Sequence, residues 1–266
     1  MVKIHIGTAG WDYKDWVGPF YPKPLDRYNH LEFYSNYFDI IEINSTFYNI
    51  PKKETVINWY NQVSADFKFV VKVWQKITHN LNDSDLDYVI SQFFSQLYPL
   101  REKVIAYLLQ FPPWFKYTEK HFSQLKFLSN ELPSEHKYVI ELRDDSWFKE
   151  EIVSELIDGS NFVLGTTYMP RVKAFYLTNQ KLYYIRLIGD RELSVFNRIQ
   201  RNQEESINDL VRNLQILEKL PNIYEIFIIV NNHFQGYAPE SINLLKKRLN
   251  LPLKEFTQQK KLSDYI

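Results

Sequence analysis

Eight short runs rich in Val, Ile, Phe and Tyr recur along the chain, and almost every run has a polar or charged residue at or near its end. Runs of this length and composition are typical of β-strands, and most are separated by stretches able to form helices. The predicted strands begin at Lys3, Ile40, Phe69, Val104, Tyr138, Phe162, Tyr183 and Ile226. The predicted helices span residues 30–38, 53–63, 84–97, 118–132, 149–157, 204–220 and 239–249. This alternation predicts a (β/α)8 TIM barrel, irregular around the sixth βα unit, where residues 169–180 hold a short helix or none.

Alternation along each predicted strand sorts its side chains between two faces. Residues two apart share a face, so Glu42 lies with Asn44, and Glu141 lies with Arg143. The flanking residues are apolar, as expected of side chains that face the surrounding helices: Ile41, Ile43, Ile140, Leu142, Ile185 and Leu187. The charged side chains should therefore point into the barrel near the carboxyl ends of the strands, where TIM barrels have their active sites.

Composition narrows the class of protein. A chain of 266 residues fits one barrel, so residues 1–266 are predicted to form a single TIM-barrel domain. The 32 basic and 32 acidic residues cancel, which leaves no global field toward nucleic acid or an anionic membrane. No cysteine is present, which excludes disulfides, thiolate metal sites and cysteine nucleophiles. No apolar run approaches the ~20 residues of a membrane span, and the first residues lack a signal peptide pattern, so we expect a soluble, cytoplasmic protein with no membrane partner.

Several common catalytic motifs are absent from the sequence. It contains no GxSxG nucleophile elbow, no GxGxxG dinucleotide loop and no GxxxxGK[ST] phosphate loop. The chemistry must therefore come from the residues at the predicted strand ends.

Five ionic residues fall at those ends. Lys72, Arg143 and Arg186 face Glu42 and Glu141, which leaves an excess of one positive charge. Converging Arg and Lys side chains suit a phosphate or a carboxylate. Gln110, Asn231 and Asn232 are neutral donors for the same ligand. The alternative is a self-satisfied ionic layer that closes the barrel, since buried charges must be paired.

Acid–base roles follow from the same residues. A carboxyl group beside Arg stays ionised, so Glu42 and Glu141 are expected to act as orienters or bases. His79 or Lys72 is then the expected proton donor. A metal site would combine His79 and His233 with the two carboxylates, but no HxH or HExxH pair is present, so neither a metal nor another cofactor is predicted.

Aromatic residues gather on the same predicted face. Five of the six tryptophans follow a predicted strand: Trp11, Trp16, Trp74, Trp114 and Trp147. The rings of the first connection, 11–26, either bury one another or stack on a base or sugar, and Tyr48, Trp114 and Trp147 present the same alternatives. The connection 189–203 carries Arg191, Arg198 and Arg201 and is a candidate flap.

Seven sequence blocks occur in an order that resembles the YecE-like family, a domain of unknown function. They are IGTAGW with DWVGPFYP, EINSTFYNIP, FKFVVKVWQKITH, LLQFPPWF, IELRDDSW, YYIRLIG and VNNHFQGYAPE. The resemblance implies a TIM-type barrel with conserved polar residues at one mouth, but no established reaction. Likeness of that family to endonuclease IV and xylose-isomerase-like barrels suggests nucleic-acid or sugar binding by analogy. The matching positions are Trp11, Glu42, Asn44, Thr46, Phe47, Tyr48, Lys72, Thr78, His79, Gln110, Glu141, Arg143, Trp147, Arg186, Asn231 and Asn232.

Two positions depart from the family pattern. Ile188 stands where the family usually has histidine after strand seven, and Thr166 and Thr167 stand where strand six commonly offers an acidic residue. Both differences remove candidate metal ligands or proton carriers, which disfavours metal-dependent hydrolysis.

The leading hypothesis is a protein that binds an anionic, phosphate-bearing ligand at the barrel mouth: a nucleotide, a nucleic acid or a sugar phosphate. It would act as a hydrolase or lyase. The candidate catalytic residues are Glu42, Lys72, His79 and Glu141. The candidate substrate-binding residues are Trp11, Asn44, Tyr48, Gln110, Arg143, Trp147, Arg186, Asn231 and Asn232. The alternatives are a metal-dependent phosphodiesterase similar to endonuclease IV and a non-catalytic binding protein. The sequence predicts no oligomeric state.

Overall fold

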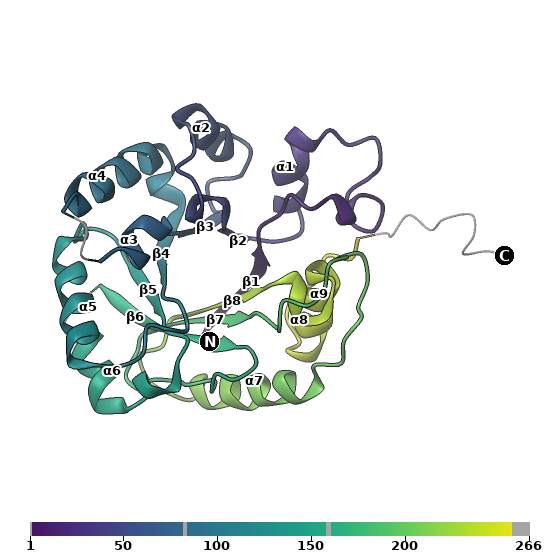
Figure 1. Ribbon diagram of the computed structural model, residues 1–266. Helices are drawn as coiled ribbons and strands as arrows, with labels where there is room; N and C mark the ends of the chain where they lie inside the picture. Colours follow the sequence, from purple (N-terminus) through teal and green to yellow (C-terminus); the bar gives the residue numbers. More distant parts are fainter. Residues whose placement is uncertain (1, 82–83, 158–160, 257–266) are drawn as a thin grey trace.

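Eight parallel strands close into a barrel in chain order in the computed structural model, which describes residues 2–81, 84–157 and 161–256 (Figure 1). The strands are β1 (Lys3–Ala9), β2 (Ile40–Ile43), β3 (Lys68–Lys72), β4 (Val104–Gln110), β5 (Tyr138–Glu141), β6 (Phe162–Tyr168), β7 (Leu182–Leu187) and β8 (Glu225–Val230). Strand β8 pairs with β1 in parallel, from Lys3 opposite Glu225 to Thr8 opposite Val230, and this pairing closes the ring. The predicted TIM barrel is confirmed.

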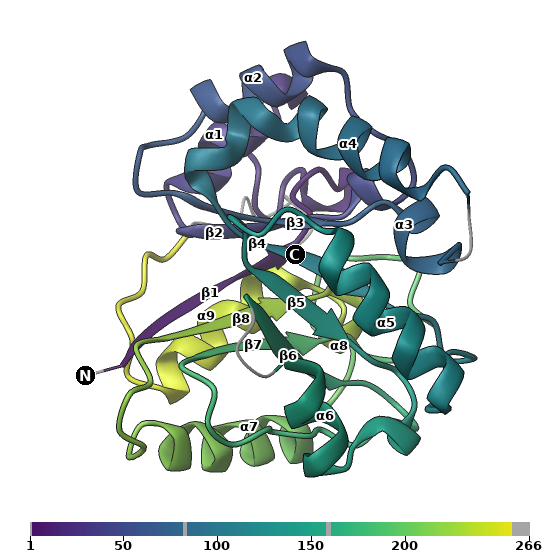
Figure 2. The ribbon, with the colours of Figure 1, turned by 90° about the vertical axis from the view of Figure 1, so that its left-hand side faces the viewer.

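A ring of helices surrounds the strands. They are α1 (His30–Ser35), α2 (Lys53–Asn61), α3 (Gln75–His79), α4 (Leu86–Leu97), α5 (Glu119–Glu131), α6 (Glu150–Ile157), α7 (Glu204–Leu217), α8 (Asn232–Gln235) and α9 (Ala238–Arg248). Helices α1, α2 and α4 cover one side of the barrel, and α6 and α7 cover the opposite side (Figure 2). All seven predicted helices are present. No helix joins β6 to β7, a connection that lies wholly within the described residues, so the predicted irregularity of the sixth unit is confirmed.

Two short helices were not predicted. The third apolar run continues to His79 in the sequence, but β3 ends at Lys72 and the chain turns into α3. The second, α8, follows β8 directly and begins where the Asn231 side chain accepts a hydrogen bond from the backbone nitrogen of His233. Both helices lie at the carboxyl ends of their strands and form part of the mouth.

Side chains inside the barrel form an apolar layer that is separate from the layer between strands and helices. The inner layer contains Ala9, Ile40, Val70, Ala106, Leu108, Val139, Leu182, Tyr184, Phe227 and Ile229. The six apolar residues predicted to face the helices belong to the outer layer. The alternation read from the sequence is therefore confirmed, and it directs residues two positions beyond the inner layer into the mouth.

Gly7 allows strands β1 and β2 to lie close together. A Cβ atom at this position would lie 2.1 Å from the carbonyl oxygen of Ile40. Real side chains do not tolerate that separation, so the absence of a side chain lets the backbones approach. The first strand can then take its place between β2 and β8.

The connection after β1 packs its aromatic rings together. Trp16, Phe20 and Tyr21 are buried, and the Trp16 ring lies edge-on to Phe20 at 5.8 Å and beside Tyr21 at 6.0 Å. Only a short 3-10 turn, Lys14–Trp16, interrupts the first part of this loop. These three rings bury one another and are not available to stack on a ligand.

In the described residues, no helix is both long and apolar enough to cross a membrane.

Candidate functional site

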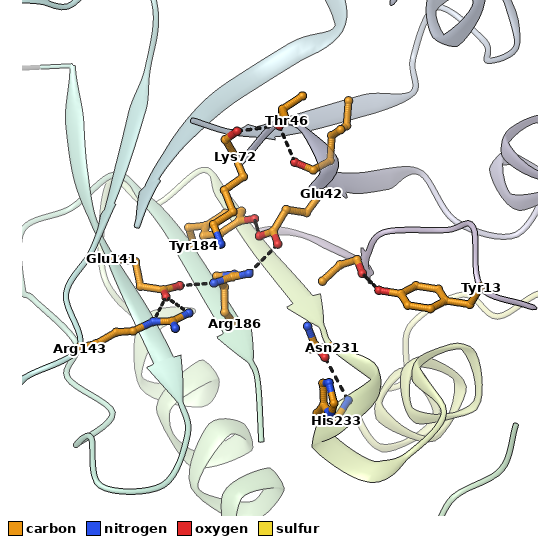
Figure 3. Close-up of polar contacts among 12 residues, drawn as sticks. Tyr13, Glu42, Thr46, Lys72, Glu141, Arg143, Tyr184, Arg186, Asn231 and His233 are labelled. Carbon is orange, nitrogen blue, oxygen red and sulfur yellow. Dashed lines mark hydrogen bonds and ion pairs between the residues drawn. The ribbon is translucent and has the colours of Figure 1, made fainter. Parts of the chain in front are cut away.

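Five ionic side chains converge inside the carboxyl-terminal mouth of the barrel (Figure 3). Glu42 lies on β2, Lys72 and Glu141 end β3 and β5, Arg143 follows β5, and Arg186 lies near the end of β7. Each is at most 6% exposed. Four of them lie two positions after a residue of the inner layer, and Arg143 lies two positions after Glu141. The alternation of side chains along each strand therefore brings all five to one place.

Four of the five form one continuous ionic chain. Arg186 donates from Nη2 to Glu42 Oε1 at 2.6 Å and from Nη1 to Glu141 Oε2 at 2.5 Å. Arg143 donates from Nε to Glu141 Oε1 at 2.6 Å. The Tyr184 hydroxyl donates to Glu42 Oε2 at 2.6 Å, so all four carboxylate oxygens accept a hydrogen bond. The self-satisfied ionic layer considered above therefore describes these residues well.

The ionic chain keeps Glu141 ionised. Burial alone would raise the pKa of Glu141, but the positive charges of Arg143 and Arg186 and the Arg186 hydrogen bond hold that pKa well below its usual range. The negative charges of Glu141 and Glu42 in turn raise the pKa of Arg186 against the effect of its own burial. Glu141 is thus an orienting anion at neutral pH and not a proton donor.

Lys72 is the fifth ionic residue and is not part of the ionic chain. Its Nζ lies 3.8 Å from the centroid of the Phe47 ring, and no carboxylate oxygen of the described residues lies within 4.0 Å of it. In Figure 3 its side chain extends toward Arg186 and the two carboxylates. Burial, followed by the positive charge of Arg186, lowers its pKa from 10.5 to about 7, against the weaker opposing effect of the carboxylates. An amine with this pKa is about half protonated at neutral pH.

Two arginine nitrogens in the mouth have unused hydrogen-bonding capacity. Arg186 Nε and Arg143 Nη2 are buried without a hydrogen bond to the described residues. Arg143 Nη2 is 2.6 Å from Glu141 Oε1, an ion pair whose angle does not meet hydrogen-bond geometry. Buried donors without partners are costly, so both positions favour an additional acceptor.

Arg191 adds a further positive charge at the rim. It follows Gly189 in the connection after β7 and has a positive φ of 65°. Burial and the positive charge of Arg143 lower its pKa, while Tyr48 acts in the opposite direction. Arg191 lies four residues beyond the carboxyl end of β7, and its side chain is exposed. From the sequence, Arg191 was predicted to belong to a flap and not to the ligand site, because its only signal was an arginine in the connection after the seventh strand.

The two candidate histidines lie on the short helices of the mouth. His79 on α3 has Nδ1 2.8 Å from Thr78 Oγ1, and its ring lies edge-on to Phe47 and Trp114. Burial, and then the charges of Lys72 and Arg143, lower its pKa. Burial and then Arg191 lower the pKa of His233. Neutral imidazoles at pH 7 fit proton acceptors better than the donor expected of His79.

The mouth does not fit a catalytic metal. Among the described residues no group of three or more His, Asp and Glu side chains is placed to hold a metal ion. Glu42 and Glu141, the carboxylates expected to share in such a site, are instead paired with arginines. The metal-dependent phosphodiesterase therefore gains no support from the donor set.

Three of the candidate binding residues make internal contacts. Gln110 Nε2 donates to the carbonyl oxygen of Phe111 at 2.9 Å. Trp147 is fully buried and donates from Nε1 to the carbonyl oxygen of Phe115 at 2.7 Å. Asn232 Oδ1 accepts from Trp16 Nε1 at 3.2 Å and from the backbone nitrogen of Ala238 at 3.0 Å. These contacts hold loops of the mouth together. Burial was one of the two alternatives for Trp147, whereas Gln110 and Asn232 were expected only as donors to a ligand.

The remaining candidates lie around the rim. Tyr48 is 62% exposed. Trp11 and Asn44 line a cavity of about 580 Å³ that is also lined by α2, where Trp11 lies edge-on to Trp59 at 5.7 Å. Asn231 is half-buried and starts α8. Trp11 and Asn44 therefore lie in a cavity that the five ionic residues do not line.

Replacement of Asn232 tests its structural role. Asn232→Ala leaves the Trp16 indole nitrogen and the Ala238 backbone nitrogen without their acceptor, so we expect a loss of about 1–3 kcal/mol in the free energy of unfolding. Urea denaturation followed by tryptophan fluorescence measures this. A loss of anion affinity with unchanged stability would instead assign Asn232 to ligand binding.

Comparison with known sequences places the chain beside proteins without an assigned activity. A family model described as "Protein of unknown function DUF72" matches residues 5–264. The chain is 30% identical over 145 residues to UPF0759 protein YecE of Escherichia coli (strain K12), a match covering 54% of this chain and 50% of YecE, so it spans about half the length of that relative. It is 22% identical over 264 residues to UPF0759 protein YunF of Bacillus subtilis (strain 168), covering 90% of this chain and 92% of YunF.

Solved structures of similar proteins have the same fold. A DUF72 family protein from Enterococcus faecalis V583 superposes with a TM-score of 0.75 at 24% identity, covering 95% of this chain and 99% of that chain. One from Thermotoga maritima MSB8 superposes with a TM-score of 0.78 at 25% identity, covering 93% and 99%. The likeness extends across nearly the whole barrel.

Proposed function

Because the chain belongs to the DUF72 family, whose description assigns no function, we propose from the site that it binds a small anionic, phosphate-bearing ligand at the carboxyl-terminal mouth of the barrel. Lys72 and Arg143 would contact the anion from inside the barrel and Arg191 from the rim. Arg186, expected from the sequence to be a third clamp, would act mainly by holding Glu42 and Glu141.

The observation that carries this proposal is the unpaired charge of Lys72. Arg143 and Arg186 neutralise the two carboxylates of the ionic chain, so Lys72 is a positive charge in excess. Burying a cation without a counter-ion costs free energy, and a bound anion would restore that loss. A structural layer has no need of this fifth ionic group.

The neighbouring groups favour a phosphate over a neutral ligand. Arg143 Nη2 and Arg186 Nε each lack a hydrogen bond to the described residues, and phosphate oxygens accept several bonds at once. Arg191 provides a second positive charge in excess, which matches the nearly double negative charge of a phosphate monoester at pH 7. The exposed ring of Tyr48 would accommodate the sugar or base of a sugar phosphate, nucleotide or nucleic-acid end.

Calorimetric titration tests the proposal. Inorganic phosphate, ribose 5-phosphate, adenosine monophosphate and a short single-stranded oligonucleotide serve as probes at pH 6.5. We expect at least one to bind, and Lys72→Met and Arg143→Met each to weaken it by about ten- to a hundredfold, because each removes a charged contact. The matched control is Arg212→Met, an exposed arginine paired with Asp209 on α7.

The pH dependence supplies a second readout. Lys72 loses its proton above a pH of about 7, so affinity should fall as pH rises through that value. Binding should therefore be accompanied by proton uptake near pH 7. Failure of every probe to bind the parent, or equal binding by Lys72→Met, would overturn the proposed function.

A further inference from the structure

We infer that Lys72 is a nucleophilic amine that forms an imine with the carbonyl carbon of an aldehyde or ketone ligand in the barrel mouth. The inference rests on the proposed function, because the anion site would hold the charged end of the same ligand. It narrows the ligand class to phosphate-bearing carbonyl compounds and the reaction class to imine-dependent lyases.

The position of Lys72 supports this role. It ends β3 at the carboxyl-terminal mouth, and with 5% of the side chain exposed it is almost enclosed without being fully sealed from solvent. Its Nζ rests over the face of Phe47, which offers no acceptor for the amine protons as strong as a carboxylate or carbonyl oxygen. An amine needs an uncommitted lone pair for attack, and an apolar surface beside other cations provides it.

A second buried lysine provides the contrast. Lys103 is 7% exposed and also lies over an aromatic ring, that of Tyr60. Its Nζ, however, donates to the carbonyl oxygens of Tyr60 and Val63, each at 2.7 Å. Those hydrogen bonds favour the protonated amine and serve to hold the chain before β4. Burial alone therefore does not distinguish the two lysines, whereas the partners of Nζ do.

The charges around Lys72 poise it between its two protonation states. Arg186 on β7 and Arg143 after β5 disfavour the ammonium, while Glu141 and Glu42 favour it. The positive charge of Lys72 lowers the pKa of His79 on α3, and the positive charge of Arg143 lowers the pKa of Arg191 at the rim. With the effect of burial these bring the pKa of Lys72 to about 7, so both the neutral nucleophile and its conjugate acid are populated at neutral pH.

The reaction balances without another reactant. The Nζ lone pair forms a bond to the carbonyl carbon, and the carbonyl π electrons move to oxygen, which receives a proton. One amine proton has then moved to oxygen, which gives a carbinolamine. The hydroxyl leaves with the second amine proton as water, and a C=N bond remains. Protonation of the imine restores the positive charge that Glu42 and Glu141 face, so the ionic chain need not rearrange.

Reductive trapping tests the inference. Glyceraldehyde 3-phosphate and its phosphate-free counterpart glyceraldehyde are each incubated with the whole protein and sodium cyanoborohydride, and adducts are mapped by peptide mass spectrometry. We expect Lys72 to be labelled at least tenfold faster by the phosphorylated probe, and more slowly in excess inorganic phosphate. Lys103 should stay unlabelled, and exposed lysines give the background rate.

Lys72→Arg separates this inference from the proposed function. Arginine keeps the positive charge but is not an imine-forming amine, so this variant should lose the fast adduct whatever its affinity for inorganic phosphate, which calorimetry measures beside that of the parent protein. Labelling of Lys72 no faster than the exposed lysines, in a protein that binds phosphate, would overturn the imine and leave the anion site. Failure of the parent protein to bind inorganic phosphate and every other phosphate-bearing probe would overturn both.

Discussion

Arg186→Met is expected to lower the free energy of unfolding by about 3–5 kcal/mol at pH 7, because Glu42 and Glu141 would both lose the guanidinium that joins them. Glu42 would retain only the Tyr184 hydroxyl, and Glu141 would retain Arg143. Glu42, which has no exposed surface, would then be a buried carboxylate without an ion-pair partner. Denaturant unfolding at pH 7 measures the loss.

The sign of the pH dependence identifies the cause. In the parent protein the pKa of Glu141 is lowered, so its contribution to stability is present above its unfolded value of about 4.5 and is lost as pH falls below it. Without Arg186 the desolvated carboxylates favour protonation, so the variant should approach the parent as pH falls from 7 toward 4.5. Arg212→Met should match the parent throughout. A deficit below 1 kcal/mol, or one independent of pH, would contradict the ionic chain as a cooperative unit.

Lys72→Met is expected to stabilise the protein. The lowering of the lysine pKa from 10.5 to about 7 corresponds to a loss of about 5 kcal/mol in the free energy of unfolding at pH below 7. Methionine fills a similar volume without a charge. The gain should be several kcal/mol, reduced by the lost contact between the ammonium and Phe47. A stabilising substitution that also abolishes anion binding would place Lys72 among residues retained at the expense of stability.

The interval between pH 7 and 10.5 provides the check on Lys72→Met. There the unfolded lysine is protonated and the folded one is not, so the stability of the parent rises with pH and the gap between variant and parent closes. Unfolding at pH 6, 8 and 9 measures this gap, with Lys181→Met, an exposed lysine, as the control. A variant no more stable than the parent at pH 6 would show that Lys72 carries no uncompensated charge.

The barrel could be predicted from the sequence because its strands and helices have different hydrophobic periods. Every predicted strand and helix is present, and Ile41, Ile140 and Ile185 face outward as alternation required. The end of β3 was less visible, because the apolar pattern continues through Val73 and Ile77 into α3. A turn over the rim of a barrel depends on where neighbouring strands end, and a single run does not reveal that.

Membership of the candidate site was predictable, but the pairing within it was not. Strand alternation predicted that Glu42, Lys72 and Glu141 lie at one mouth. Which arginine pairs with which carboxylate depends on distances across the barrel, and a sequence does not show these. Lys72 has no ion pair because the two arginines already pair with both carboxylates. The burial of Trp147 and the engagement of Asn232 likewise depend on loops that pack together only in the folded molecule.

Closure of the barrel pairs β1 with β8, a strand that begins more than 200 residues later, and this has a consequence for the order of folding. Contacts between residues so distant in sequence form slowly, because a long loop must close before they can contribute. On the ribosome β1 must wait until Val230 has been made. Glu42 and Glu141 can pair with Arg186 only after β7 has been made, so the ionic chain that organises the mouth cannot form before seven of the eight strands are present.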